Sequence, residues 1–287
     1  MTETVQPFCV LMSVYQGETL AHLQRAVASA TVEQTLPPEQ CVIVRDGPVP
    51  QDMQRYLDDL ADDDSARHIT RFTIVPLEHN DGLAHALNVG LAHCDHELVA
   101  RADSDDISLP DRFATQLPLF QGGAIDVAGS AIREFSGDET HLGQVRTLPA
   151  GGPELARYAR LQSPLHHPSV VFRKSAVLAA GGYPEHAGRF EDYLLWERML
   201  LRGARMRNVG APLVLYRVDA GAYERRGGRD MFREEVRLQR RFLADGFVTR
   251  TQFLRNVTVR AVYRLVPTRA RRAAYRALTA LRNRGRR

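Results

Sequence analysis

The stretch Leu98-Val-Ala-Arg-Ala-Asp103-Ser-Asp105-Asp106 joins a short apolar run to three carboxylates within four residues. The run Leu98-Val-Ala100 is typical of a β-strand buried on both faces, so the acids stand where that strand ends. Neighbouring carboxylates repel one another unless a cation lies among them. Oxygen ligands of this kind suit Mn²⁺ or Mg²⁺, which typically bind one or two carboxylates together with substrate phosphates. A solvated acidic turn is the alternative interpretation of this stretch.

Upstream of these acids, short β-rich runs alternate with helical patterns. The predicted strands are 8–14, 41–44 and 72–75, and the predicted helices between them are 20–30, 51–60 and 83–93. This alternation indicates βαβ units around a mainly parallel sheet flanked by helices. Because ligands of such sheets bind beyond the carboxyl ends of the strands, the residues that follow each run are candidate site residues. They are Tyr15, Asp46 and Asp103.

Downstream, strand and helix patterns are mixed. The predicted strands are 126–129 and 165–173, and the predicted helices are 153–161, one from 174 to Gly181-Gly182, and 190–202. A loop rich in glycine and arginine at 221–229 separates these elements from three further helical patterns at 230–245, 252–265 and 269–283. We therefore expect a main domain over 1–229 and a helical basic extension over 230–287.

The charge distribution divides the chain into an acidic body and a basic tail. Residues 248–287 contain twelve arginines and no acidic residue, whereas the rest carries 26 basic against 34 acidic residues. A chain of this kind is not a general polyanion binder, and only its tail is a candidate to bind an anionic surface. There is no signal-peptide pattern and no apolar run of about 18 residues. The three cysteines lack metal-binding spacing and are typical of buried thiols. These features predict a cytoplasmic protein.

Two further acidic motifs each allow a structural and a functional interpretation. Val44-Arg-Asp46-Gly-Pro48 places a carboxylate where it can accept hydrogen bonds from a base or a ribose, although Asp-Gly-Pro is also common turn chemistry. Glu191-Asp192 opens a predicted helix, where the acids either cap the helix or take a proton from a substrate hydroxyl. Neither motif decides between its interpretations alone.

Histidines and the single tryptophan are weaker signals. His166 and His167 precede a proline at the start of a predicted strand, where neighbouring side chains point to opposite faces, so a shared metal site is disfavoured. Trp196 is expected to pack in the core, and stacking on a sugar is the alternative.

Taken together and in this order, these segments resemble family 2 of the inverting glycosyltransferases, which have the GT-A fold. The resemblance covers about residues 8–245 and extends to a subgroup that builds bacterial exopolysaccharide and capsule of the amylovoran type. It rests on Leu11-Met-Ser-Val-Tyr15, Val44-Arg-Asp-Gly47, Asn80-Asp-Gly-Leu-Ala-His-Ala-Leu-Asn88, Ala100-Arg-Ala-Asp-Ser-Asp-Asp106, His167-Pro168, Glu191-Asp-Tyr-Leu-Leu-Trp196, Tyr216-Arg-Val218 and Tyr223-Glu-Arg-Arg-Gly-Gly228. The implied fold is α/β, with a mixed, mainly parallel central sheet.

The resemblance implies a nucleotide-binding half over about 1–125 and an acceptor-binding half over about 126–229. The nucleotide contacts that it implies are Ser13, Tyr15, Asp46 and Asp103. Asp105 matches the ligand of Mn²⁺ or Mg²⁺, and Asp103 is the second candidate. Asp192 matches the catalytic base. The acceptor contacts that it implies are Glu191, Trp196 and His167.

One departure from the family pattern concerns the diphosphate. Many members supply a histidine after the helix that begins with the acid pair, but the corresponding stretch from Tyr216 to Arg226 has none. Arg225 and Arg226 are the candidates to hold the diphosphate instead, because guanidinium groups suit bidentate phosphate contacts.

The implied reaction is a single in-line displacement with inversion. Asp192 deprotonates an acceptor hydroxyl, and a nucleoside diphosphate leaves from the donor, for which a UDP-sugar is favoured. The implied acceptor is a lipid-linked glycan of bacterial surface polysaccharide synthesis. The rival interpretations are a nucleotidyltransferase that makes sugar nucleotides and a protein that binds them without turnover. A nucleotidyltransferase usually has a basic, glycine-rich loop after its first strand, and Ser13-Val-Tyr-Gln-Gly-Glu18 has no basic residue.

In the tail, arginines alternate with apolar residues over 252–264 and 269–284. Basic amphipathic helices of this kind can lie on an anionic membrane surface, which predicts peripheral attachment to the cytoplasmic face of the inner membrane. The alternative is a helix packed on the acidic body with solvated arginines. We expect no nucleic-acid partner, because nucleic-acid binding leaves the acidic motifs of the body unexplained.

Overall fold

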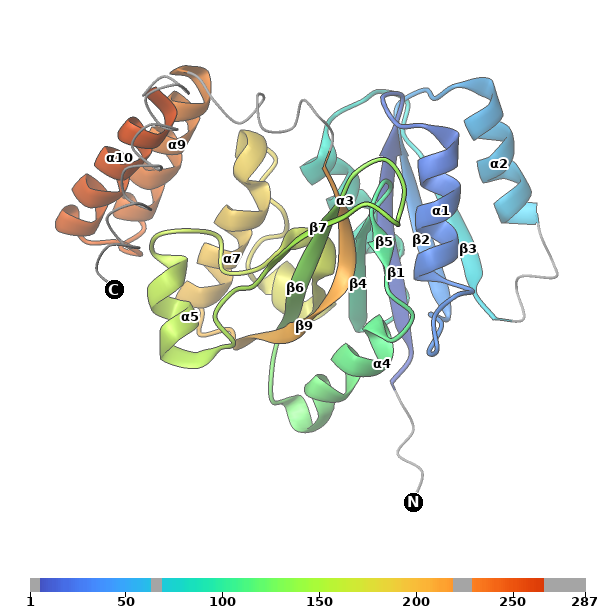
Figure 1. Cartoon of the computed structure of the whole chain (residues 1–287), viewed down its shortest axis with the longest axis horizontal. Coiled ribbons are helices and arrows are strands. Elements are labelled where there is room, and N and C mark those ends of the chain that lie inside the picture. The colour runs from blue at the N-terminus through green and yellow to red at the C-terminus, as the bar shows by residue number, and fades with distance from the viewer. Residues whose placement is uncertain (1–5, 63–68, 219–228, 266–287) are drawn as a thin grey trace, which may run out of the picture. The chain divides into compact units, whose positions relative to one another are not determined.

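The computed structural model describes residues 6–62, 69–218 and 229–265, and Figure 1 follows their elements along the chain. The chain divides into two compact units, Met1–Asp219 and Ala220–Arg287. The division falls beside the loop rich in glycine and arginine where the sequence predicts the end of the main domain.

The first unit is built on one mixed sheet of nine strands. Four parallel strands form one half, in the order β3 (Arg71–Pro76), β2 (Gln40–Asp46), β1 (Phe8–Tyr15) and β4 (Leu98–Asp103). The sheet continues from β4 through β8 (Val171–Arg173), β6 (Val127–Phe135), β9 (Met206–Arg217) and β5 (Ile107–Ser108), while β7 (Leu142–Arg146) pairs with β6. In this second half β6 and β9 are parallel, and the remaining pairings are antiparallel. The predicted mixed sheet is confirmed.

Helices cover both faces of this sheet (Figure 1). They are α1 (Leu20–Ala30), α2 (Gln51–Asp62), α3 (Leu83–His93), α4 (Arg112–Gln116), α5 (Gly152–Ala159), α6 (Lys174–Ala179) and α7 (Glu191–Leu201), with 3₁₀ turns at Leu117–Gly123, His167–Ser169 and Gly188–Phe190. Thr19 caps α1 by accepting a hydrogen bond from His22 N at 3.3 Å. This satisfies one of the amides that have no partner within the helix.

Alternate residues of the central strands pack into two cores on opposite faces of the sheet. Along β1, Cys9 and Leu11 belong to one core, and Phe8, Val10 and Met12 belong to the other. The first core, which we call the α7-side core, takes side chains from α3, α6 and α7, and the second takes them from α1, α2 and α4. Because both faces are covered, the central strands are continuously apolar, which is the pattern that the sequence shows.

The segment at 165–173 forms a shorter strand than predicted. Its first part is a 3₁₀ turn in which Ser169 N donates to His166 O at 2.9 Å, and only Val171–Arg173 is strand. Pro168 has no amide hydrogen to give to a central ladder, so the strand begins after it. The resulting β8 pairs antiparallel with both β4 and β6, and it joins the two halves of the sheet.

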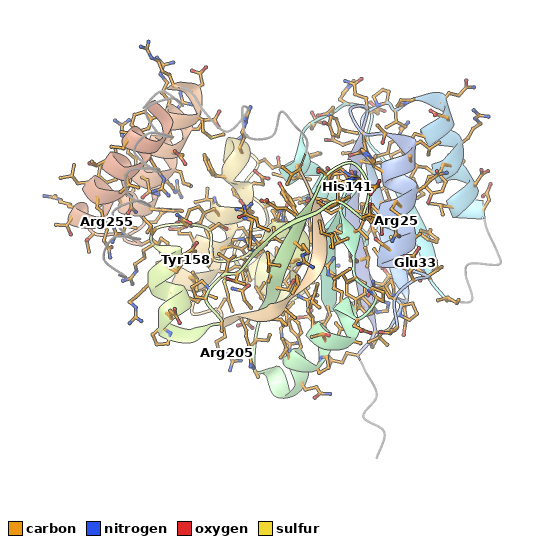
Figure 2. The ribbon with its side chains drawn as sticks, in the orientation of Figure 1. Arg25, Glu33, His141, Tyr158, Arg205 and Arg255 are labelled. Atoms are coloured by element: carbon orange, nitrogen blue, oxygen red, sulfur yellow. The ribbon has the colours of Figure 1, made fainter. Side chains whose placement is uncertain are left out.

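An ion pair joins the hairpin between β6 and β7 to α1. Arg25 of α1 forms ion pairs with Glu33 and with Glu139 at the hairpin tip, and its Nη1 lies 2.7 Å from Glu33 Oε2. Figure 2 labels Arg25 and Glu33 together with His141, which follows Glu139 in the same hairpin. The hairpin thus links the second half of the sheet to the first helix of the chain.

The second unit contains two helices, α9 (Arg229–Ala244) and α10 (Arg250–Leu265). Asn256 Nδ2 of α10 donates a hydrogen bond of 2.8 Å to Gln239 Oε1 of α9. The ring of Phe242 in α9 packs against Phe247 in the connecting loop, with ring centroids 5.2 Å apart. The helices predicted at 230–245 and 252–265 are confirmed, and the pattern at 269–283 lies outside the described residues. Within the described part of the chain, no helix combines the length and apolar character needed to cross a bilayer.

Candidate active site

Three carboxylates gather where β4 ends. Asp103 is the last residue of β4, and Asp105 and Asp106 follow in the turn that leads to β5. Each of the three acids offers an oxygen within 4.8 Å of the others. We call Asp103, Asp105 and Asp106 the acid cluster. Parallel strands bring their carboxyl ends to one edge, which is why the cluster forms beside the ends of β1 and β2.

The acid cluster carries more negative charge than the protein neutralises. Burial, followed by the charges of Asp103 and Glu18, raises the pKa of Asp105 to about 7. Burial also raises the pKa of Asp106 well above its usual range, and Asp106 Oδ2 has no hydrogen-bond partner among the described residues. A divalent cation bound by these oxygens would stabilise the ionised carboxylates, and it would give Asp106 Oδ2 a partner. The residues present therefore fit such an ion.

Two arginines order the chain around the acid cluster, and one of them contacts the cluster directly. Arg112 is fully buried, and it donates to the carbonyl of Arg101 at 2.6 Å and to Ser108 Oγ at 2.9 Å. Arg217, at the end of β9, donates through its backbone N to Asp106 Oδ1 at 2.8 Å and through its Nε to Asp105 O at 2.9 Å. The pairing of β5 with β9 brings Arg217 to this turn from a distant part of the sequence.

Arg217 is a site residue that the sequence analysis missed, although it belongs to the motif Tyr216-Arg-Val218. It stands at the start of the stretch in which the family's histidine is absent. In that stretch the structure places a guanidinium group, not an imidazole, beside Asp105 and Asp106. Arg225 and Arg226 lie outside the described residues, and their role at the diphosphate stays a prediction.

The predicted nucleotide contacts share the same edge of the sheet. Ser13 pairs in register with Asp103, and Tyr15 pairs with Asp46. The Tyr15 side chain is 48% exposed and lies against Gly17, where a Cβ atom would collide with its ring. A glycine at this position therefore lets the ring lie over the loop after β1, in a place accessible to a planar ligand.

Asp46 is 4% exposed, and its carboxylate accepts hydrogen bonds from Asp81 N at 3.0 Å and Gly82 N at 3.2 Å. Gly47 follows with a φ of +80°, and its Cα faces the backbone of Asn80 so closely that a side chain would not fit. The turn interpretation of Asp-Gly-Pro is thus supported by geometry. A base or ribose contact of Asp46 stays a prediction, and its carboxylate already orders the loop before α3.

The acid pair Glu191-Asp192 opens α7. Asp192 Oδ1 accepts a hydrogen bond from Tyr193 N at 2.6 Å. Burial and the adjacent charge of Glu191 raise the pKa of Asp192 to about 7, and burial raises the pKa of Glu191 as well. A carboxylate with a pKa near the working pH is matched to the task of a general base.

Trp196 lies in the α7-side core with no exposed surface, so it cannot stack on an acceptor sugar in this conformation. The burial of Trp196 supports the core-packing interpretation, and its acceptor contact stays a prediction. The physical reason is helical periodicity, because a residue four positions after Asp192 lies one turn further along the same inward face.

His166 and His167 have different partners. His166 Nε2 lies 3.2 Å from Arg146 O, whereas His167 Nε2 lies 3.0 Å from Tyr183 Oη. Burial lowers the pKa of both imidazoles, so both are neutral at pH 7. Neither belongs to the group of possible metal ligands found among the described residues. Acceptor contacts of His167 and Glu191 stay predictions.

Comparison with known proteins decides the family. Residues 9–178 match the family model described as Glycosyl transferase family 2. The chain belongs to this family. The predicted family and enzyme class are confirmed, and family membership argues against the nucleotidyltransferase alternative.

Two relatives of this family 2 glycosyltransferase match it over nearly their whole length. It is 35% identical to the amylovoran biosynthesis glycosyltransferase AmsE of Erwinia amylovora, over 93% of this chain and 97% of that protein. It is 31% identical to the UDP-Gal:alpha-D-GlcNAc-diphosphoundecaprenol beta-1,3-galactosyltransferase of Escherichia coli, over 96% of this chain and 98% of that protein.

The fold has a counterpart among solved structures. The crystal structure of S. aureus TarS 1–349 in complex with UDP-GlcNAc superposes with a TM-score of 0.66 at 17% identity, and the match covers 90% of this chain and 73% of that chain. At this level of identity the likeness concerns the fold alone. The predicted GT-A-type architecture is confirmed.

Proposed function

We propose that this glycosyltransferase moves a sugar from a UDP-sugar to a hydroxyl group of a lipid-diphosphate-linked glycan, with inversion at the anomeric carbon. The observation that carries the proposal is the pairing of an acid cluster suited to a cation with a second, separate acid pair whose Asp192 has a pKa of about 7. The Escherichia coli relative supports the substrate class, because its name states a UDP-sugar donor and a diphosphoundecaprenol-linked acceptor.

In the proposed mechanism Asp192 accepts the proton of the acceptor hydroxyl. Its Oδ1 is occupied by the amide of Tyr193, which leaves Oδ2 for the substrate. As the acceptor oxygen bonds to the anomeric carbon, the bond from that carbon to the diphosphate oxygen breaks, and the nucleoside diphosphate leaves with the electron pair. The protein supplies positioning and charge and forms no covalent intermediate.

The donor side of the proposed mechanism rests on the edge formed by β1, β2 and β4. Tyr15 offers an exposed ring to the nucleotide, and Ser13 and Asp46 lie beside it. Asp105, with Asp103 as the second candidate, would hold Mn²⁺ or Mg²⁺, and a bound ion would offset the charge that develops on the leaving diphosphate. Arg217 adds a fixed positive charge at the same turn.

A thermal-shift screen tests the donor assignment directly. UDP-, GDP- and dTDP-sugars are each offered with Mn²⁺, with Mg²⁺ and with EDTA. We expect the largest shift with a UDP-sugar in the presence of a divalent ion, and UDP-galactose is the first to try. A larger, ion-independent shift with a GDP- or dTDP-sugar would overturn the donor assignment.

We further propose that the second unit attaches the enzyme to an anionic membrane surface on the cytoplasmic face of the inner membrane. On α10, the side chains of Leu254, Val259 and Val262 are 66%, 52% and 60% exposed. Arg250 and Arg255 of the same helix are also exposed. A helix that exposes apolar side chains together with cations suits the boundary between lipid headgroups and acyl chains. Co-sedimentation with vesicles that contain anionic lipid tests this attachment.

A further inference from the structure

The hairpin between β6 and β7 has a polar tip at residues 136–141, in which Ser136 N donates to His141 O at 3.2 Å. Four of the five residues of β7 are exposed, and the register of its pairing with β6 shifts between Arg133 and Phe135. A strand that buries so little apolar surface gains little from packing. Contacts from outside the hairpin therefore matter for the position of its tip.

Two arginines from other elements hold this tip. Arg25 of α1 pairs with both carboxylate oxygens of Glu139, and its Nη2 lies 3.0 Å from Glu139 Oε2. Arg217 of β9 donates from Nη1 to Gly137 O at 2.8 Å, and its guanidinium carbon lies 4.5 Å from the centroid of the Phe135 ring. That ring contact has the geometry of a cation–π interaction. The tip is thus anchored both to α1 and to the end of β9.

The same guanidinium also holds the turn of the acid cluster. Arg217 Nε donates to Asp105 O at 2.9 Å, while the backbone N of Arg217 donates to Asp106 Oδ1 at 2.8 Å. Because a guanidinium is planar and rigid, Nε and Nη1 keep a fixed spacing and direction. The carbonyls of Asp105 and Gly137 are therefore held in a fixed relation to each other. Arg217 forms a brace between the hairpin tip and the backbone from which the Asp105 carboxylate projects.

A cation in this position can affect a metal site in two opposite ways. Both hydrogen-bond acceptors of the Arg217 guanidinium are neutral carbonyl oxygens, so these hydrogen bonds do not neutralise its charge. As a charge, the group repels a divalent ion at the acid cluster and weakens its binding. As a brace, it keeps Asp105 in place and strengthens that binding, as residues that support metal ligands do. The two effects predict opposite results when the guanidinium is removed.

We propose that Arg217 is a positioning residue that braces Asp105 against the β6–β7 hairpin, and that its bracing effect outweighs its repulsion of the cation. The hairpin tip is thereby a working part of the cation site. This inference rests on the proposed role of Asp105 as a ligand of Mn²⁺ or Mg²⁺. Arginine suits the task better than lysine, because an ammonium group is a point charge without a planar fork and cannot hold two carbonyls in fixed directions.

Arg173, the last residue of β8, provides a matched control. Like Arg217, it is half-buried. It donates from Nε to Ile125 O at 3.1 Å and from Nη2 to Phe120 O at 2.7 Å, and its guanidinium carbon lies 5.6 Å from the centroid of the Phe120 ring. Arg173 therefore holds two carbonyls and covers a phenyl ring as Arg217 does, but its acceptors belong to the segment before β6. Losing Arg173 should lower stability to a similar degree and leave the acid cluster intact.

The experiment measures the binding of Mn²⁺ to the full-length protein in the absence of nucleotide. The protein is stripped of metal with EDTA and dialysed, and free Mn²⁺ is followed by electron paramagnetic resonance. Arg217→Met removes the charge and the brace, whereas Arg217→Lys keeps the charge and removes the fork. Arg173→Met is the control, and circular dichroism checks the folding of each variant. Two substitutions of Arg217 keep the test decisive if one of them does not fold. Because no donor is present, a direct contact between Arg217 and a phosphate group cannot cause the effect.

We expect Arg217→Met and Arg217→Lys to weaken Mn²⁺ binding about 10-fold or more, the usual loss when a residue supporting a metal ligand is removed. Arg173→Met should bind Mn²⁺ as the wild type does. Unchanged or tighter binding in Arg217→Met would mean that bracing does not outweigh repulsion, and it would overturn the inference. Wild-type affinity in Arg217→Lys, or an equal loss in Arg173→Met, would overturn it as well.

The other anchor of the hairpin gives an independent test. Glu139→Gln removes the ion pair to Arg25 and should weaken Mn²⁺ binding about twofold to fivefold, because exposed ion pairs contribute little. In the Arg217→Met background the same substitution should have no further effect, since the tip is then disconnected from the turn. Asp95→Asn breaks another exposed ion pair, with Arg71, and should leave Mn²⁺ binding unchanged. An absent effect of Glu139→Gln, or an equal effect in both backgrounds, would overturn the role of the hairpin.

The variant Asp105→Ala separates this inference from the proposed function. If Asp105→Ala binds Mn²⁺ as the wild type does, the proposed ligand fails, whatever the Arg217 variants show. If Asp105→Ala loses the ion and Arg217→Met keeps it, the proposed ligand stands and only the brace is wrong.

Discussion

The acid cluster after β4 and the acid pair at the start of α7 contain the same chemical group in two different settings. Asp105 and Asp192 both have a pKa raised to about 7, and burial is the largest cause in both. They differ in their neighbours. Asp105 stands among Asp103, Glu18 and Asp106, whereas Asp192 has one acidic neighbour, Glu191.

The different neighbours suit the two acidic groups to two different chemical tasks, cation binding and proton transfer. Several carboxylates with a shortage of positive charge favour binding a cation, which holds them all ionised. A single carboxylate with a pKa near neutrality and one adjacent acid favours gaining and losing a proton. The same residue type thus serves charge neutralisation at one end of the site and proton transfer at the other.

The substitution Asp192→Asn tests most directly whether Asp192 is the catalytic base. We expect kcat to fall by about 10²–10⁴-fold, because an amide cannot take the acceptor proton. Donor binding should persist, since the acid cluster is untouched. Initial-rate kinetics together with calorimetric titration of UDP would measure both effects. Near-normal turnover would remove Asp192 from the role of base.

Asp105→Ala tests the other end of the site. Mn²⁺-dependent binding of UDP should weaken by at least the roughly 10–100-fold that is lost when a residue supporting a metal ligand is removed. Calorimetry with Mn²⁺ and with EDTA separates the metal-dependent part. Asp95→Ala, which changes an exposed acid at an ion pair with Arg71, is the control and should bind as the wild type does. A metal dependence unchanged in Asp105→Ala would refute its assignment as a ligand.

The pH dependence of the reaction sharpens the comparison. A raised pKa means that Asp192 is protonated, and therefore inactive as a base, at low pH. At saturating metal, kcat/KM should rise about tenfold per pH unit below about 7 and level off above it. A profile that is flat from pH 5 to pH 8 would contradict both the environment of Asp192 and its role.

Membrane attachment tests whether the second unit acts apart from the site. Replacing Leu254 and Val262 with serine should reduce co-sedimentation with anionic vesicles about tenfold or more, because two exposed apolar side chains no longer enter the interface. UDP binding should be unchanged. If the double variant still sediments as the wild type does, the exposed face of α10 is not the anchor.

The smallest expected effect concerns Trp196. Because it packs in the core, Trp196→Phe should lower the free energy of unfolding by about 1–3 kcal/mol, which denaturant titration measures. The KM for acceptor should stay the same. A selective rise in that KM with unchanged stability would restore the sugar-stacking interpretation.

The sequence by itself determined the first half of the fold and the identity of the acids. Strands 8–14, 41–44 and 98–100 are almost continuously apolar because helices cover both faces of the sheet there, and that pattern can be recognised from short stretches of sequence. The acid motifs that follow strands, or open a helix, are likewise contiguous in the sequence. Their order along the chain was enough to identify the family.

Only the tertiary structure determined which residues surround those acids. Arg217 reaches the acid cluster through the pairing of β5 with β9, a contact across more than 100 positions that no local pattern encodes. The inward direction of Trp196 depends on which face of α7 the core covers. Sequence patterns specify residue types and periodicity, whereas burial and charge neighbours, which set pKa values, arise only when distant elements pack together.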